Sequence, residues 1–178
     1  MDPAKAQDIV DWPRLTNQKE VQPRLGLWNF YRRFIPNYAQ IVVPITDIVM
    51  GNGKDLCFGE AQEAAFLKIV ILFTSGNTPI LRHFDQERPA LIEKDASDCA
   101  IGAVHSEKFE DGKILPSAFL SRQLSPAEFN YNVFDKEMLL IVYALQNWRH
   151  YVLGTKHKTT IFLDHQNLEY STKKVKLN

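Results

Sequence analysis

The segments ALIEKD (residues 90–95), IGAVHS (101–106) and ILPSAFLS (114–121) decide the fold of this 178-residue chain, because their hydrophobic pattern has a period of two. This period predicts β-strands with one buried face. The second and third segments are joined by a polar connection that contains Asp111-Gly112, a dipeptide favoured in tight hairpin turns. The simplest pairing is an antiparallel meander of three strands.

A helix and a fourth strand are expected after the meander. The segment SPAE (125–128) resembles a capping box, and Asp135 is positioned to cap a helix that continues to Gly154, the residue just past its end. The extended segment TTIFLD (159–164) follows, and HQNLEY (165–170) is able to open another helix. The expected order is therefore three strands, a helix, a strand and a helix.

The part before the strands has a helical pattern. We expect helices over residues 2–13, about 16–36, 39–50 and 59–74. Pro23 lies inside the second, and an interior proline costs about 3 kcal/mol or more, so this helix should kink or begin later than its capping signal suggests. The polar turn after ILRHFD (80–85) is the candidate boundary between the two parts.

Composition and charge limit the class of protein. The chain is 45% hydrophobic, and its 21 basic and 21 acidic residues cancel, so contact with a polyanion requires a local patch. Residues 146–178 carry six Lys or Arg against two acids, net +4, whereas residues 85–137 carry six against eleven, net −5. This arrangement suits a metal site that handles a phosphate backbone, although a charge run is more often a solvated face.

Other patterns exclude several classes. Cys57 and Cys99 lack the spacing of a zinc site or a disulfide framework, and the five histidines are scattered. No apolar stretch reaches the roughly 20 residues of a membrane span, and the start of the chain has no signal-peptide pattern. We therefore expect an intracellular chain without a membrane partner.

Three acids stand in apolar-patterned segments. Asp95 ends the first strand, Glu137 lies near the start of the helix and Asp164 ends the fourth strand. Two strand ends beside one helix would bring them together as a Mg²⁺ site. Taken singly, each has a simpler interpretation: a turn residue, an acid favoured by the helix dipole, and an Asx turn.

The amino-acid sequences of several segments resemble those of one protein family. EKDASDCAIGAV (93–104), the segment from AFLSRQ to YVLG (118–154) and FLDHQNLEY (162–170) resemble the RNase H domain of gypsy-type long-terminal-repeat retrotransposon polyproteins. The segment from WPRL to TDIV (12–49) resembles the thumb end of the same polyprotein's reverse transcriptase, and ILRHFD with its preceding helix resembles the connection. The resemblance covers nearly the whole chain.

The resemblance implies an α/β fold. It divides the chain into a helical thumb-like region (1–50), a connection (51–88) and an RNase H-like domain (89–178) with three antiparallel strands, a parallel fourth strand and helices. The family continues with a fifth strand, a closing helix and a fourth carboxylate, so a truncated domain with an open edge on the fourth strand is expected. A homodimer or a domain swap is one way to cover that edge.

The resemblance also implies hydrolysis of the RNA strand of RNA:DNA hybrids. Asp95 would bridge two Mg²⁺ or Mn²⁺ ions, Glu137 would hold one and Asp164 the other. The hybrid would be selected by shape and 2′-hydroxyl contacts. Such a chain would work in the cytoplasm, in a virus-like particle or in the nucleus. The residues expected to contact nucleic acid are Arg32, Arg33, Arg122, Lys156, Lys158, His165, Lys173 and Lys174.

Some residues depart from the family. No paired-aspartate polymerase motif of the YxDD kind occurs in the sequence, so no polymerase activity is expected from this chain. Lys94 stands where the family usually has a small hydroxyl residue, which puts a cation beside Asp95, and His105 replaces an apolar strand residue. The missing fourth carboxylate and the open edge support a second interpretation, a catalytically inactive remnant that binds nucleic acid or a protein partner.

Overall fold

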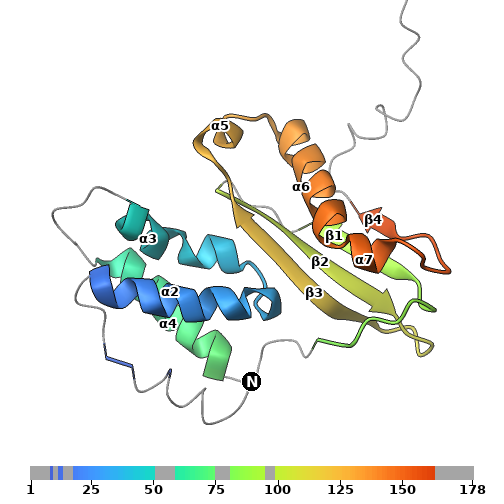
Figure 1. Ribbon diagram of the computed structural model, residues 1–178, viewed down its shortest axis with the longest axis horizontal. Helices are drawn as coiled ribbons and strands as arrows, with labels where there is room; N and C mark the ends of the chain where they lie inside the picture. Colours follow the sequence, from blue (N-terminus) through green and yellow to red (C-terminus); the bar gives the residue numbers. More distant parts are fainter. Residues whose placement is uncertain are drawn as a thin grey trace, which may run out of the picture.

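A computed structural model describes residues 9, 12–13, 18–50, 59–74, 81–94 and 99–162. Three layers are visible in Figure 1: a group of helices, a mixed β-sheet, and further helices on the other side of the sheet. The described part of the chain contains no helix long and apolar enough to cross a membrane.

In the described part of the chain, the first layer contains three α-helices and one short 3₁₀ helix with complete bounds. They are α2 (Gln18–Tyr31), η1 (Arg32–Phe34), α3 (Tyr38–Met50) and α4 (Glu60–Thr74). The helices expected over 39–50 and 59–74 are confirmed. For the second helix we expected either a kink or a later start at Pro23; α2 begins at Gln18 and runs through Pro23, so the later start is not observed. Pro23 is exposed and near the N-terminal end, so it removes only the hydrogen bond to the carbonyl of Lys19.

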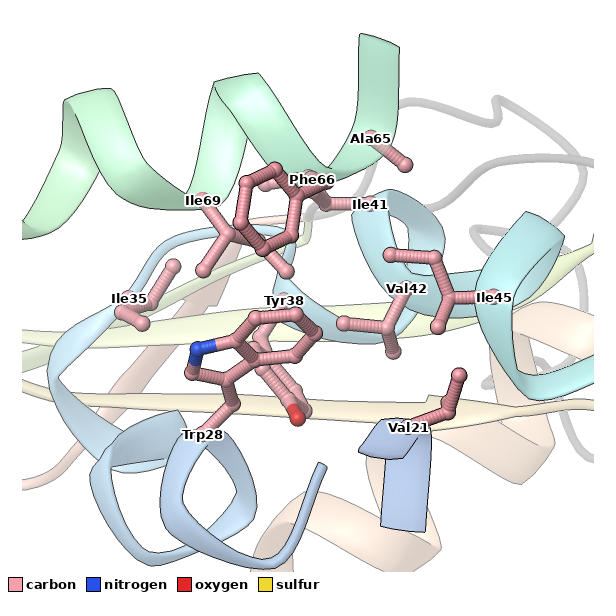
Figure 2. Packing of buried hydrophobic residues seen from close by; sticks show 10 residues of the cluster. All are labelled: Val21, Trp28, Ile35, Tyr38, Ile41, Val42, Ile45, Ala65, Phe66 and Ile69. Carbon is pink, nitrogen blue, oxygen red and sulfur yellow. The ribbon is translucent and has the colours of Figure 1, made fainter. Parts of the chain in front are cut away.

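A compact apolar core holds these helices together. Figure 2 shows Trp28 of α2 facing side chains of α3 and of α4. Trp28 is fully buried, and its ring centroid lies 5.9 Å from that of Phe66. Ile45 and Ile69 are also fully buried, and each such side chain contributes about 1.5–3 kcal/mol by leaving water. The packing of three helices around one tryptophan therefore fixes this layer.

The sheet has the predicted mixed topology. Its strands are β1 (Ala90–Lys94), β2 (Ala100–Lys108), β3 (Ile114–Gln123) and β4 (Thr160–Phe162), in the order β3-β2-β1-β4. The pairs β1/β2 and β2/β3 are antiparallel, and β1/β4 is parallel. The predicted hairpin turn is confirmed, with Gly112 at a φ of 81°, where a residue without Cβ is favoured.

The other helical layer consists of α5 (Pro126–Phe129), α6 (Val133–Asn147) and α7 (Arg149–Val152). The capping box is confirmed, because the Ser125 hydroxyl accepts from the Glu128 amide and the Glu128 carboxylate accepts from the Ser125 amide. Gly154 follows α7 with a φ of 80°, as expected for a residue just past a helix end.

Two details of this helix were predicted wrongly. The cap is Asn132, whose side chain accepts from the Asp135 amide at 2.9 Å, so Asp135 lies in the first turn instead of before it. The helix also does not continue unbroken to Gly154. It ends at Asn147, and buried Trp148 separates it from α7.

Helices cover both faces of the sheet. On one face, buried Ile92, Ile101 and Ala103 pack against Leu140 and Ala144 of α6. On the other face, η1 and α3 contact β3, and the Ala39 amide donates to the Ser121 hydroxyl at 3.0 Å. The sheet is therefore the shared middle layer of the molecule.

Candidate functional site

The parallel pairing of β1 and β4 places the C-terminal ends of both strands side by side, at the same end of the sheet, and this end forms the edge that bears the candidate site. Ile92 pairs with Ile161 and Glu93 with Phe162, so both strands run toward this edge. The described part of β1 ends at Lys94. In the sequence, Asp95 directly follows Lys94 and Asp164 is the second residue after Phe162.

Glu137 is the acid that the structure places at this edge. It lies in the second turn of α6, on the side of the sheet away from α2, α3 and α4 (Figure 1). Its spacing from Leu140 and Ala144 puts all three on the buried stripe of the helix. Glu137 is only 2% exposed. A carboxylate therefore occupies a position where the helical pattern calls for an apolar residue.

Lys94 is the charged partner of Glu137. Its Nζ lies 2.5 Å from Glu137 Oε1. Burying an ion costs several kcal/mol, and an opposite charge at hydrogen-bond distance offsets part of that cost. Glu137 Oε2 is buried and has no hydrogen-bond partner among the described residues. One oxygen of the carboxylate is thus held by the ammonium, and the other is unpaired within the described ranges.

Lys94 borders a small apolar cavity. A cavity of about 10 Å³, roughly the size of one water, lies beside Lys94 and is otherwise lined by apolar residues. These residues are Ile92, Ala103, Leu140, Ile141, Ala144, Ile161 and Phe162. Electrostatic interactions are stronger beside such walls than in water.

A lone buried carboxylate oxygen fits a hard divalent cation. Mg²⁺ binds through one or two carboxylates and keeps several waters, so Glu137 Oε2 is a suitable ligand. Within the described ranges, no three or more His, Cys, Asp or Glu side chains are grouped so that they could hold a metal ion. The other two predicted ligands, Asp95 and Asp164, lie outside the described residues.

The predicted nucleic-acid contacts fall in separate places. Arg32 and Arg122 both line a cavity of about 400 Å³ between α2, α3, β3 and α6. Lys156 and Lys158 line another, of about 460 Å³, near β4. Arg33 is exposed, and its guanidinium lies 6.0 Å from the Phe34 ring centroid. The remaining candidates, His165, Lys173 and Lys174, lie outside the described residues.

Two of these cations are already paired. Arg122 donates to both carboxylate oxygens of Glu128, at 2.8 and 3.0 Å, and this pairing raises the pKa of Arg122. Lys156 Nζ donates a hydrogen bond to a carboxylate oxygen of exposed Glu87 at 2.8 Å. This hydrogen bond raises the pKa of Lys156. Their charge is therefore partly balanced before any polyanion arrives.

The sequence did not lead us to predict the ion pair between Lys94 and Glu137. It placed this cation beside Asp95, whereas the structure sets its ammonium on Glu137, 43 residues away. The signal was present in the alternation of β1, because Ile92 faces α6 and Lys94, two residues later, shares that face.

Comparison with known proteins gives consistent matches. Residues 58–161 match the family described as the RNase H-like domain found in reverse transcriptase. The Transposon Tf2-3 and Tf2-4 polyproteins of Schizosaccharomyces pombe (strain 972) are each 39% identical over 162 residues, which are 90% of this chain and 12% of each polyprotein. The chain thus spans about an eighth of the length of these relatives.

Two solved structures share the fold. The foamy viral protease-reverse transcriptase dRH in complex with double-stranded DNA has a TM-score of 0.74 at 21% identity, over 94% of this chain and 29% of that one. The foamy viral protease-reverse transcriptase in complex with an RNA/DNA hybrid has a TM-score of 0.73 at 21% identity, over 96% of this chain and 24% of that one. The similarity includes both the helical layer and the sheet.

Proposed function

The chain belongs to the family of RNase H-like domains found in reverse transcriptases, and from this premise we propose that it hydrolyses the RNA strand of RNA:DNA hybrids using divalent metal ions. Its relatives are transposon polyproteins, so the activity would act within a retrotransposon polyprotein. The observation that carries the proposal is the buried carboxylate of Glu137, whose Oε2 lacks a partner among the described residues at the edge where β1 and β4 end.

The proposed metal site is completed by two acids. Asp95 and Asp164 follow the two strands that run to this edge, which supports their assignment as ligands beside Glu137. Bound Mg²⁺ would activate water and stabilise the leaving oxygen, and Mn²⁺ is able to replace it. The role of the protein residues is to hold their carboxylates in place: α6 fixes Glu137 by its buried stripe, and β1 and β4 fix the points from which the other two emerge.

The proposed substrate is a hybrid duplex. Two solved proteins of the same fold are described as complexes with double-stranded DNA and with an RNA/DNA hybrid, which supports a nucleic-acid duplex as the partner. Arg32, Arg33 and Lys158 are exposed candidates for phosphate contacts, and no ion-pair partner is identified for them among the described residues. Selection of a hybrid would come from its wide minor groove and 2′-hydroxyls instead of base edges.

Cleavage of a labelled RNA:DNA hybrid in Mg²⁺ tests this proposal. Glu137→Gln, Asp95→Asn and Asp164→Asn, which keep side-chain shape and remove a charge, should each reduce cleavage by about 100-fold or more. Glu93→Gln is the matched control, because Glu93 is an exposed acid of β1 and should leave the rate unchanged. Cleavage by Glu137→Gln at the wild-type rate would sink the proposal.

A second function is favoured by the Lys94 ammonium on Glu137, since a cation already occupies one ligand oxygen. The chain would then bind hybrid without cutting it. The result that selects this alternative is absence of Mg²⁺-dependent cleavage together with hybrid binding that weakens steeply as salt is raised.

A homodimer is also proposed, through the edge of the sheet. In the described sheet β4 is the outer strand, and its Phe162 is 51% exposed. Pairing with a second copy would cover this edge. Light scattering that shows only monomer at high concentration would contradict it.

A further inference from the structure

Lys94 and Glu137 form a preassembled ion pair inside the proposed metal site. The residues lie on different elements, and the alternation of β1 points Lys94 at the buried stripe of α6. The Lys94 side chain is 19% exposed and that of Glu137 is 2% exposed, so solvent screens their interaction only weakly. Unlike a surface ion pair, this contact therefore has a large electrostatic effect on anything else that binds Glu137.

A divalent ion and the Lys94 ammonium are competitors for this carboxylate. A metal on Glu137 Oε2 would lie within a few ångströms of Nζ, because Nζ is at hydrogen-bond distance from the other oxygen of the same group. Like charges repel at that separation, and the burial of Glu137 leaves little solvent to reduce the repulsion.

We propose that Lys94 is a built-in competitor of the metal: its ammonium occupies Glu137 in the metal-free chain, and a divalent ion binds when the ammonium moves away. The inference rests on the proposed function, since it takes Glu137 as a metal ligand. Lys94 is then a positioning residue that keeps the Glu137 carboxylate at the edge of β1 and sets the metal concentration at which the site fills.

The path for the ammonium is short. Lysine has a flexible four-carbon stem, and the partial exposure of Lys94 means that its end reaches solvent by rotation without unfolding β1. Glu137, in contrast, is fixed in the buried stripe of α6. The moving partner is therefore Lys94.

Metal binding to the whole 178-residue chain tests the inference. Lys94→Gln removes the charge but retains a group able to hydrogen-bond Glu137, and its affinity for Mn²⁺, measured by calorimetry, should rise by about tenfold or more over wild type. Lys94→Arg keeps the charge and should bind Mn²⁺ no tighter than wild type. Wild-type affinity in Lys94→Gln would overturn the inference.

A matched control removes a positive charge elsewhere. Lys113 pairs with Asp111 in the β2–β3 hairpin, at the end of the sheet opposite to Lys94. Lys113→Met should leave Mn²⁺ affinity as in wild type. An equal increase in Mn²⁺ affinity in Lys113→Met and Lys94→Gln would mean that affinity depends only on net charge. That result would contradict the inference.

Thermal unfolding separates competition from a purely structural role. Lys94→Met should unfold at a lower temperature than wild type in EDTA, because Glu137 loses its counter-ion, and should gain more from Mg²⁺ than wild type gains. The double variant Lys94→Met, Glu137→Gln removes both charges, and Mg²⁺ should raise its unfolding temperature by less than it raises that of Lys94→Met. A structural lysine would lower the unfolding temperature without enlarging the response to Mg²⁺.

The outcomes also separate this inference from the proposed hydrolysis. Tighter Mn²⁺ binding in Lys94→Gln with no cleavage by any variant would support competition and reject hydrolysis. Equal Mn²⁺ affinity in wild type and Lys94→Gln, together with cleavage that requires Glu137, would support hydrolysis and reject competition. If neither wild type nor Lys94→Gln binds Mn²⁺, both are overturned.

Discussion

The Nδ1 atom of His105 lies 2.6 Å from the hydroxyl oxygen of Ser117, across the paired strands β2 and β3. The same hydroxyl lies 3.1 Å from the His105 carbonyl oxygen, to which it is able to donate. Nε2 is buried without a partner among the described residues, beside the ring of Trp148. This histidine is therefore built to be neutral.

His105 should make the fold sensitive to acid. Burial, with a smaller effect from His150, lowers the pKa of His105 from 6.5 to about 4. The unfolded chain takes up this proton below pH 6.5 and the folded chain does not, so stability is lost as pH falls from 6.5 toward 4. This group should remove about 2 kcal/mol of unfolding free energy between pH 7.5 and 5.

Urea denaturation at the two pH values measures this effect. His105→Leu should abolish most of the difference, because it keeps an apolar volume and has no proton to gain. Exposed His83 supplies the control, and His83→Gln should retain the wild-type dependence. An unchanged pH dependence in His105→Leu would show that other groups are responsible.

The core between α2, α3 and α4 predicts that two isoleucines of α4 contribute differently to the unfolding free energy. Ile69 is fully buried and Ile71, two residues later on α4, is 57% exposed. Ile69→Ala should lower the unfolding free energy by about 2–5 kcal/mol, and Ile71→Ala by less than about 1 kcal/mol. Equal losses in denaturant melts would mean that the Trp28 core is not packed as described.

The bidentate ion pair of Arg122 and Glu128 predicts that removing Glu128 lowers the unfolding free energy. Glu128→Ala removes this pair and the acceptor for the Ser125 amide, so unfolding free energy should fall by about 1–2 kcal/mol. Exposed Glu110 is the control, and Glu110→Ala should have an effect within about 0.5 kcal/mol. Comparable effects of the two substitutions would count against the pair.

The same site predicts a pH dependence. Hydrogen bonds from Arg122 and Ser125 lower the pKa of Glu128 from 4.5 to about 2. The contribution of its carboxylate is therefore complete above pH 4.5 and is lost as pH falls through 2. The difference in unfolding temperature between wild type and Glu128→Gln should stay constant from pH 5 to 8 and shrink below pH 4.5.

The contact between Ser121 and the Ala39 amide predicts the effect of one hydroxyl. Ser121→Ala leaves a partly buried N–H at the start of α3 without its acceptor and should cost about 1–2 kcal/mol. Ser121→Thr keeps the hydroxyl and should be close to wild type. Amide hydrogen exchange at Ala39 is the direct measurement, and it should speed up only in Ser121→Ala.

The sheet was predictable because local pattern determines it. Alternating apolar residues gave the strands, and Asp111-Gly112 gave the turn because glycine favours a positive φ. The break in α6 at Trp148 was not predictable. No glycine or proline stands there, and the helix ends where the Trp148 ring packs against His105, 43 residues away.

The candidate site was predictable only in part. Glu137 was identified as an acid in an apolar-patterned helical segment, and in the structure its side chain is 2% exposed. Its pairing with Lys94 depends on how α6 lies across β1, which is a property of tertiary packing. The assignment of Asp95 and Asp164 as ligands stays a prediction, because both lie outside the described residues.

The position of the sheet between two helical layers has a consequence for how the molecule unfolds. Strand β3 belongs to both sides, since η1 and α3 contact it on one face and buried Ala118 faces the α6 core on the other. Melting of the first helices would expose the apolar back of β2 and β3 to water. We therefore expect cooperative unfolding, with a single calorimetric transition in which loss of the helical layer and loss of the strands coincide.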